Sequence, residues 1–244
     1  MAESGGREAL AIRASGLSKA YGPHLVLRGL DLSLPWGAFL TVFGPNGSGK
    51  TTLIKVLATI ARPDEGEVAI AGFDLRKEAT AVRRNIGVVT HQPLLYADLT
   101  PRENLRFHGR MFGLKHLDER IEQAADMVGL RPHLSRRVGT LSHGLQKRAS
   151  LARAILHDPP ILLLDEPETG LDQEALEMLS AIASAGERGR RTVLMATHSL
   201  DRGLALGDRV AILANGRIAF EEERAMVDED TLRDTYGRHT RVAP

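Results

Sequence analysis

A glycine-rich stretch has the residue types and spacing that bind phosphate. It fits the P-loop pattern G-x-x-x-x-G-K-[ST] and comprises Gly44, Pro45, Asn46, Gly47, Ser48, Gly49, Lys50, Thr51 and Thr52. Glycines let backbone N–H groups turn toward phosphate oxygens, and the N-terminus of a following helix adds positive charge. Lys50 can reach the β- and γ-phosphates of a nucleotide, and the Thr51 hydroxyl can ligate Mg²⁺. The alternative is a glycine-rich turn between a strand and a helix with nothing bound.

An acidic pair follows a continuous apolar run later in the chain. The run Ile161–Leu164 is typical of a strand buried on both faces of a parallel sheet, and Asp165 and Glu166 come directly after it. Open α/β sheets bind ligands at the carboxyl ends of such strands. We expect Asp165 to hold the Mg²⁺ shell and Glu166 to polarise an attacking water as a general base. The alternative, which the P-loop pattern disfavours, is an acidic strand end that caps the next helix.

These side chains need strands and helices that bring them to one edge of a sheet. The apolar pattern predicts a helix at Lys50–Ile60 and a helical insertion at about 95–155, in which Asp118 caps the second helix. Residues 221–244 are charged and are expected to be irregular. The other predicted segments are the strands Leu25–Leu34, Ala38–Phe43, Glu67–Ala71, Ile86–Thr90 and Thr192–Ala196, the helices Pro101–Phe112, Leu145–Leu156 and Gln173–Ala185, and a hairpin of Arg209–Leu213 and Arg217–Phe220.

Composition excludes several classes of protein. The chain has 32 Lys and Arg against 31 Asp and Glu, so it lacks the basic excess of a dedicated nucleic-acid binder. The absence of cysteine removes disulfides, thiolate zinc sites and cysteine nucleophiles. The longest uncharged run, residues 32–49, contains two prolines and four glycines and is therefore no spanning helix. The N-terminus does not fit a signal peptide, so we expect a soluble chain that does not itself cross a membrane.

Residues Leu141–Gln146, taken with the P-loop and the acidic pair, resemble the ATP-binding subunits of ABC transporters. This hexapeptide looks like the signature motif of that family and lies just before a predicted helix. His143 and Leu145 depart from the glycine and glutamine usual at their positions, whereas Ser142 and Gly144, the phosphate-facing members, are kept. For His143 we favour a tolerated backbone-like position over contact with nucleotide across an interface.

The resemblance covers nearly the whole chain, from about Leu10 to Phe220. It implies an α/β P-loop NTPase fold with a mainly parallel sheet core, an N-terminal antiparallel β subdomain and a helical subdomain. It further implies a single ABC ATPase domain at residues 8–222, with the helical subdomain at about 95–155, and a charged C-terminal tail at 223–244.

Four more residues match functional positions of the family. The resemblance implies that Tyr21 stacks on adenine, and that Gln92 senses Mg²⁺ and the attacking water. It implies that Asp172 lies in the loop that crosses a dimer interface, and that His198 is the switch histidine that contacts the γ-phosphate. Without the family, Tyr21 would be interpreted as an ordinary surface or core residue and Gln92 as a loop residue.

The family also implies partners. ATP and Mg²⁺ would be held between two copies of the chain, with the P-loop of one copy facing Ser142 and Gly144 of the other. The insertion between Gln92 and Ser142 is where the family docks integral membrane permease subunits, which places the chain peripherally on the cytoplasmic face of the cell membrane. Nucleic acid is not an expected partner.

Two stretches, residues 91–107 and 164–172, look most like the heme-exporter ATPase of cytochrome c maturation. Drug- and lipid-efflux ATPases share much of this pattern but often carry a long C-terminal extension, whereas 46 residues follow His198 here. The heme system is therefore the main hypothesis and an efflux exporter the alternative. A soluble ABC ATPase of translation or DNA repair is less favoured, because the chain has one P-loop and no long coiled-coil insertion. A structural module without hydrolysis is disfavoured by the intact Lys50, Asp165, Glu166 and His198.

Overall fold

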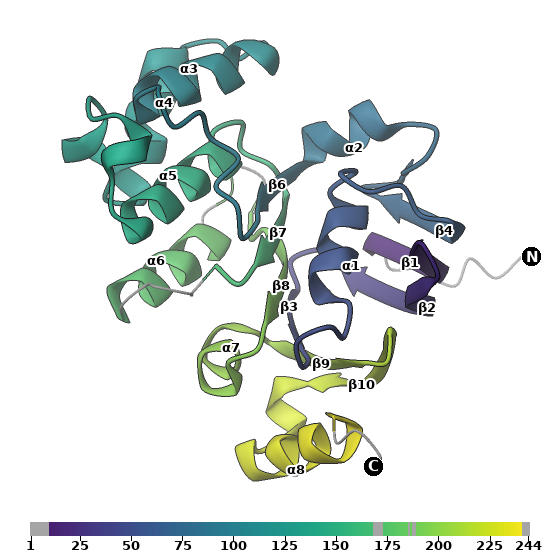
Figure 1. Cartoon of the computed structure of the whole chain (residues 1–244). Coiled ribbons are helices and arrows are strands. Elements are labelled where there is room, and N and C mark those ends of the chain that lie inside the picture. The colour runs from purple at the N-terminus through teal and green to yellow at the C-terminus, as the bar shows by residue number, and fades with distance from the viewer. Residues whose placement is uncertain (1–9, 168–172, 185, 187–188, 241–244) are drawn as a thin grey trace, which may run out of the picture.

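The computed structural model describes residues 10–167, 173–184, 186 and 189–240. These residues form two sheets, with helices packed around them (Figure 1). The α/β fold expected from the sequence, with an antiparallel subdomain, a mainly parallel sheet and a helical insertion, is confirmed. In the described ranges, we find no helix with the length and apolar character needed to span a membrane.

The larger sheet has the strand order β10-β9-β3-β8-β7-β6. All neighbours in it are parallel except β9 and β10, which pair antiparallel as a hairpin. Every residue of β3, β7 and β8 is buried, as expected for strands covered on both faces. The strands are β3 (Phe39–Phe43), β6 (Ile86–Val89), β7 (Ile161–Asp165), β8 (Thr192–Thr197), β9 (Arg209–Ala214) and β10 (Arg217–Glu223).

The smaller sheet is antiparallel and has the order β2-β1-β4-β5. Its members are β1 (Leu10–Tyr21), β2 (His24–Pro35), β4 (Glu65–Ile70) and β5 (Phe73–Asp74). Apolar periodicity did not predict β1 as a separate strand. Its pairing with β2 shifts register between Ala14 and Leu17, around Gly16 at a φ of 60°, and this bulge interrupts the alternation of apolar residues.

Two helices pack with the two sheets: α1 (Lys50–Leu57) and α2 (Ala79–Asn85). Helix α1 packs between the two sheets, where Leu53, Ile54 and Leu57 join a core cluster with Leu40 and Val42 of β3. Figure 1 shows α1 between the antiparallel strands and the central strands of the larger sheet. The predicted helix ended three residues later, so the prediction is confirmed except for its last turn.

The helical lobe consists of α3 (Pro101–Met111), α4 (Leu117–Met127) and α5 (His143–Ile155). Thr100 begins α3 with a capping box in which it exchanges hydrogen bonds with Glu103. The expectation that Asp118 caps α4 is wrong. His116 occupies the cap position at a φ of 50° without a side-chain bond, and Asp118 lies in the first turn, where its charge still suits the helix dipole.

The C-terminal part is not irregular, which corrects the sequence prediction. After α6 (Gln173–Ser184) and α7 (Leu200–Leu206), the hairpin β9–β10 leads to the helix α8 (Glu229–Thr240). Asp228 caps α8 by accepting a 2.7 Å hydrogen bond from the Thr231 backbone N–H. Leu232 of this helix is fully buried. Residues 223–240 are therefore part of the packed structure.

Candidate nucleotide site

The P-loop connects β3 to α1 through a conformation that only glycine tolerates at two points. Gly49 precedes the helix at a φ of 111°, in the left-handed region. A β-carbon at Gly44 would lie 2.5 Å from the carbonyl oxygen of Leu213. Between them, the Ser48 N–H donates to the Pro45 carbonyl at 3.2 Å and closes a tight turn. The pattern in the sequence therefore corresponds to steric requirements of the fold.

Helix α1 begins without a capping side chain and without an acidic residue in its first turn. Its first backbone N–H groups therefore keep the capacity to bind an anion. Lys50 lies at this end, 6% exposed, and its Nζ donates to the carbonyl oxygens of Gly44 at 2.6 Å and Pro45 at 3.1 Å. Burial lowers the pKa of Lys50, and the nearby charges of Glu166 and Asp165 act in the opposite direction. The arrangement concentrates positive charge at the loop.

Asp165 is the last residue of β7 and is 1% exposed. Its Oδ1 accepts a 3.2 Å hydrogen bond from the Thr51 hydroxyl, whereas its Oδ2 is buried and has no hydrogen-bond partner among the described residues. Burial raises the pKa of Asp165. A buried carboxylate oxygen without a donor, next to a hydroxyl, suits a hard cation such as Mg²⁺, which takes few protein ligands and completes its shell with water and phosphate. Thr51 and Asp165 thus fit the predicted metal.

Glu166 and His198 meet at the carboxyl ends of β7 and β8. The Glu166 backbone N–H donates to the Ala196 carbonyl at 2.9 Å, which extends the pairing of the two strands by one residue. Glu166 then leaves the sheet at a φ of 49°, and its Oε1 lies 2.8 Å from His198 Nδ1. A non-glycine residue in the left-handed region marks a position whose geometry the surroundings impose. The two side chains are presented together at the sheet edge.

A hollow of about 320 Å³ lies over the loop. It is lined by Val26, Asn46, Gly47, Gly49, Lys50, Thr51, Thr52 and Glu166. The sequence predicted all of these residues except Val26. Strand β2 brings Val26 to the loop, since a β-carbon at Gly49 would lie 3.4 Å from the Val26 carbonyl oxygen. No local pattern could have found it, because the contact joins two sheets.

Other predicted residues lie apart from this hollow. Tyr21 ends β1 and is 47% exposed, with Lys19 Nζ 5.4 Å from its ring centroid. Gln92 is exposed in the segment after β6, and its backbone carbonyl accepts a 2.6 Å hydrogen bond from the Thr90 hydroxyl. Neither side chain lines the hollow. Asp172 lies outside the described residues.

The signature residues lie at the start of α5 in the helical lobe. Ser142 is the N-cap of this helix, and its hydroxyl accepts from the Leu145 N–H at 3.4 Å. Ser142 and His143 are exposed, and Gly144 is partly exposed. None of the three lines the hollow over the P-loop. The described chain therefore presents the signature motif to solvent rather than to its own P-loop.

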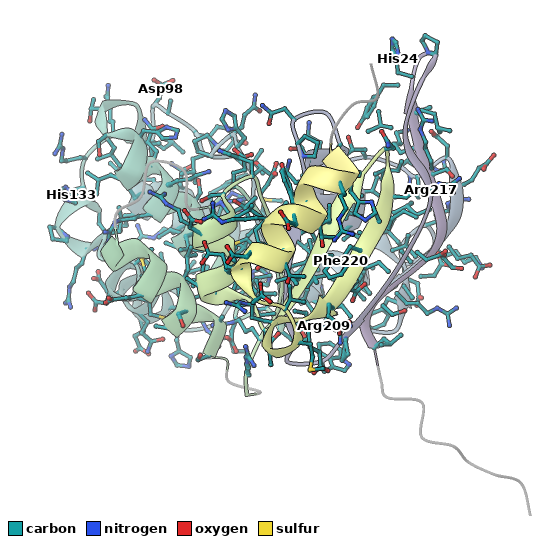
Figure 2. All side chains as sticks on the ribbon, turned by 90° about the horizontal axis from the view of Figure 1, so that it is seen from below. His24, Asp98, His133, Arg209, Arg217 and Phe220 are labelled. Carbon is teal, nitrogen blue, oxygen red and sulfur yellow. The ribbon has the colours of Figure 1, made fainter. Side chains whose placement is uncertain are left out.

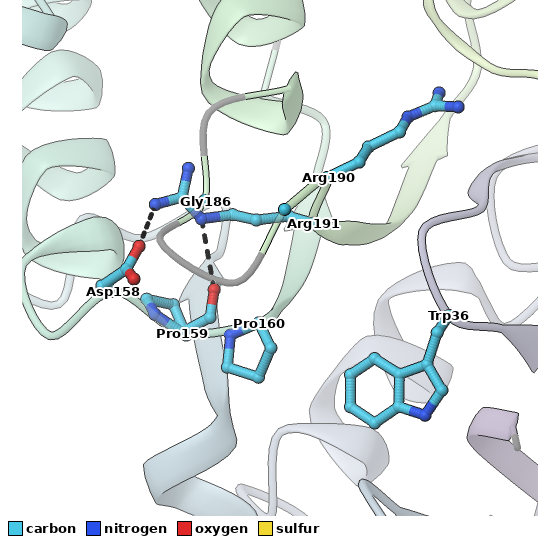
Figure 3. A pocket seen from close by; sticks show the side chains of 8 residues that line it. Trp36, Asp158, Pro159, Pro160, Gly186, Arg190 and Arg191 are labelled. Atoms are coloured by element: carbon cyan, nitrogen blue, oxygen red, sulfur yellow. Dashed lines mark hydrogen bonds and ion pairs between the residues drawn. The ribbon is translucent and has the colours of Figure 1, made fainter.

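A second hollow, of about 310 Å³, lies at the amino ends of β7 and β8, opposite the P-loop (Figure 3). Trp36, Pro160 and two arginines line it. Arg190 pairs with Asp208 at 2.7 Å, and Arg191 is buried and bonded to Asp158 and the Pro159 carbonyl. The arginines connect the loops around this hollow, which accounts for their position there. None of the predicted site residues lines it.

The loop from β3 to α1, its buried lysine, and the acidic end of β7 define a P-loop nucleoside triphosphatase. Within that class, residues 27–169 match the family model described as "ABC transporter". The chain belongs to the ATP-binding subunits of ABC transporters. It is accordingly an ATPase whose hydrolysis of ATP is coupled to transport.

Relatives support this assignment over most of the chain. The ABC transporter ATP-binding protein NatA of Bacillus subtilis is 34% identical over 80% of this chain and 80% of its own. The daunorubicin/doxorubicin resistance ATP-binding protein DrrA of Streptomyces peucetius is 38% identical over 86% of this chain and 64% of its own. The Nod factor export ATP-binding protein I of Sinorhizobium fredii is 35% identical over 95% of this chain and 69% of its own.

A solved structure agrees in fold. The ATP-binding cassette MJ0796, in a dimeric post-hydrolysis state bound to ADP and Pi, superposes with a TM-score of 0.79 at 28% identity and covers 87% of this chain and 98% of its own.

Proposed function

We propose that this chain is the ATPase subunit of an ABC exporter for drug-like or lipid-like amphiphilic compounds. The observation that carries the proposal is the similarity to proteins named for daunorubicin/doxorubicin resistance and Nod factor export, over 86% and 95% of this chain. These relatives favour the exporter alternative over the heme-exporter hypothesis. None of the relatives reported above has a name that refers to heme, and heme export rests on the resemblance of residues 91–107 and 164–172 alone.

The geometry supports a division of labour in ATP hydrolysis. Lys50 and the N-terminus of α1 would bind the phosphates, and Thr51 and Asp165 would hold Mg²⁺, which would neutralise charge on the transferred phosphoryl group. Gln92 lies apart from the hollow, and its place in the Mg²⁺ shell is what the family resemblance implies. Glu166 would accept the proton of the water that attacks the γ-phosphorus, while the bond to the β-phosphate oxygen breaks and ADP leaves. His198, 2.8 Å from Glu166, would position this carboxylate and the γ-phosphate.

Two copies would complete the site. Neither the exposed Ser142 nor the partly exposed Gly144 lines the described hollow over the P-loop of its own chain, and the related cassette MJ0796 forms a dimer. We propose a homodimer in which each P-loop faces the partner's signature motif, with Tyr21 on adenine and Asp172 at the interface.

A groove between the lobes supports docking of a membrane subunit. It has a volume of about 440 Å³, and its walls come from the segment after α1, from α2 and from β6 on one side and from α3 and α5 on the other. Its apolar residues include Ile60, Leu94 and Met111, all exposed, and Arg83 and Arg84 stand at its rim. An amphipathic helix with acidic flanks would fit this surface. The chain would then lie on the cytoplasmic face of the membrane, where ATP is available.

Co-purification tests the proposal. The tagged full chain, isolated in detergent from its native cell, should bring down an integral membrane subunit, and Met111→Glu should abolish this while retaining ATP binding. Met226→Glu is the matched control, because Met226 is 75% exposed, against 69% for Met111, and lies away from the groove. Recovery of a heme-handling membrane complex would overturn the exporter proposal, and recovery of ribosomes or repair proteins would overturn transport.

A further inference from the structure

Helix α8 packs against β9 and shares a buried apolar cluster with the strand before the P-loop and with the helix after His198. A buried apolar cluster joins Val227 and Leu232 to Phe43 of β3 and Leu204 of α7, with Leu200, Phe220 and Tyr236 packed around it. Figure 2 shows α8 lying along the β9–β10 hairpin near Phe220. The helix therefore contributes to the same core that supports the P-loop strand and the helix after His198.

Phe43 and α7 are fitted to each other without free space. Phe43 is fully buried and is followed directly by Gly44 of the P-loop. Gly203 of α7 faces its ring, and a β-carbon at Gly203 would collide with that ring. The Thr41 hydroxyl donates to the Gly203 carbonyl at 3.1 Å. Movement of α7 would therefore be transmitted to the end of β3, and the reverse.

The position of the His198 side chain depends on the packing of the helix that follows it. Its side chain is 56% exposed, and its described hydrogen bond is the one to Glu166. The helix that follows it, α7, has seven residues, too few to be stable without packing. Leu200 and Leu204 supply that packing within the cluster, and Arg233 of α8 donates to Asp201 of α7 at 2.7 Å. This ion pair is exposed and adds little, so the apolar contacts dominate.

We propose that α8 is a positioning element of the ATPase site and that Leu232 is its principal positioning residue, acting through α7 on His198. Leu232 contacts no nucleotide in this arrangement. It fills the core behind α7 and so fixes the start of that helix, two residues after His198, at the distance from Glu166 that hydrolysis requires. The inference concerns ATP hydrolysis and is independent of the exported compound.

A double-mutant cycle on the full chain tests this inference. Hydrolysis is measured by phosphate release, and ATP binding by titration with a fluorescent ATP analogue. Leu232→Ala should lower kcat about tenfold while the dissociation constant stays within about twofold, because a small displacement of a catalytic group costs rate more than binding. In a His198→Ala background, Leu232→Ala should lower kcat less than about twofold, because its route of action is already removed.

Leu34→Ala is the matched control, since Leu34 is also fully buried but lies at the far end of β2 in the antiparallel sheet. It should lower the melting temperature comparably and leave kcat unchanged. Equal losses of kcat for Leu232→Ala in both backgrounds, or an equal loss for Leu34→Ala, would overturn the proposal. If Leu232→Ala does not fold, Leu232→Val replaces it in the same double-mutant cycle, because this substitution removes less volume. The same comparison of kcat in the two backgrounds then tests the proposal. The phosphate release attributed to this site is the part that Glu166→Gln abolishes. If the unmutated protein showed no such phosphate release, the ATPase assignment would be wrong, and the result would not bear on α8.

Discussion

The two halves of the proposed ATP site are built very differently. At the P-loop, Lys50, Thr51 and Asp165 are bonded to neighbours within the chain. At the signature motif, the Ser142 hydroxyl accepts from the Leu145 N–H of its own helix, and Gly144 is partly exposed. The first half is organised by strands of one sheet, whereas the second is a helix N-terminus presented to the outside. The difference fits the proposed dimer, in which the P-loop half is organised within one copy and the signature half would serve the partner copy.

The largest expected effect comes from the organised half. Glu166→Gln removes the proposed base but keeps the size of the side chain, so kcat should fall about a thousandfold while ATP still binds. Phosphate release and ATP titration measure the two quantities. With ATP and Mg²⁺, size-exclusion chromatography of this variant should show a stable dimer. A protein that remains monomeric under these conditions would contradict the sandwich of two copies.

Complementation between damaged copies tests whether the halves belong to different chains. Lys50→Ala damages the P-loop half and Gly144→Asp damages the signature half, so each variant alone should be inactive. An equimolar mixture should recover about a quarter of the wild-type rate, because half of the dimers then contain one intact site of two. Hydrolysis no greater than that of either variant alone would show that each copy builds its own complete site.

Acid should weaken the boundary between the lobes, where His108 and His157 line the groove. Burial, together with the charge of Arg153, lowers the pKa of His108 and His157 from 6.5 to about 4. These histidines are neutral when folded, while the unfolded chain takes up protons below pH 6.5. Stability should therefore fall as the pH drops from about 6.5 to 4.

Thermal melts across this window measure the slope, which the double variant His108→Gln, His157→Gln should flatten. His116→Gln, at an exposed histidine, should leave it unchanged. An unaltered slope in the double variant would assign the acid effect to other groups.

The smallest effect concerns a helix cap in the lobe that carries the signature motif. Thr100→Ala removes the hydroxyl that accepts from the Glu103 N–H at 3.2 Å and should cost about 1 kcal/mol of unfolding free energy. Urea titration measures this cost, and ATP affinity should not change, because the P-loop lies in the other lobe. Thr80→Ala, an exposed threonine outside any cap position, is the control and should cost less. A matching loss of ATP affinity would mean that the halves are coupled within one chain.

Sequence reasoning succeeded where the signal was local. Continuous apolar runs identified β3, β7 and β8, and the Asn215-Gly216 pair identified the β9–β10 hairpin. It failed where the signal was weak or broken. The bulge around Gly16 concealed β1. Helix α8 buries few apolar side chains, chiefly Leu232, in an otherwise charged segment, so its pattern did not stand out.

The sequence by itself determined the chemical groups of the site: the glycines, Lys50 and Thr51 of one continuous loop, and the acidic pair after β7. These are local features, because steric freedom and strand burial act over a few neighbouring residues. Only the tertiary structure decided which of them meet. The bonds from Thr51 to Asp165 and from Glu166 to His198 join residues far apart in the chain, and they form because β8 lies between β3 and β7 in the sheet. Strand order depends on long-range packing of both sheet faces, including the core behind α8, and no local pattern encodes it.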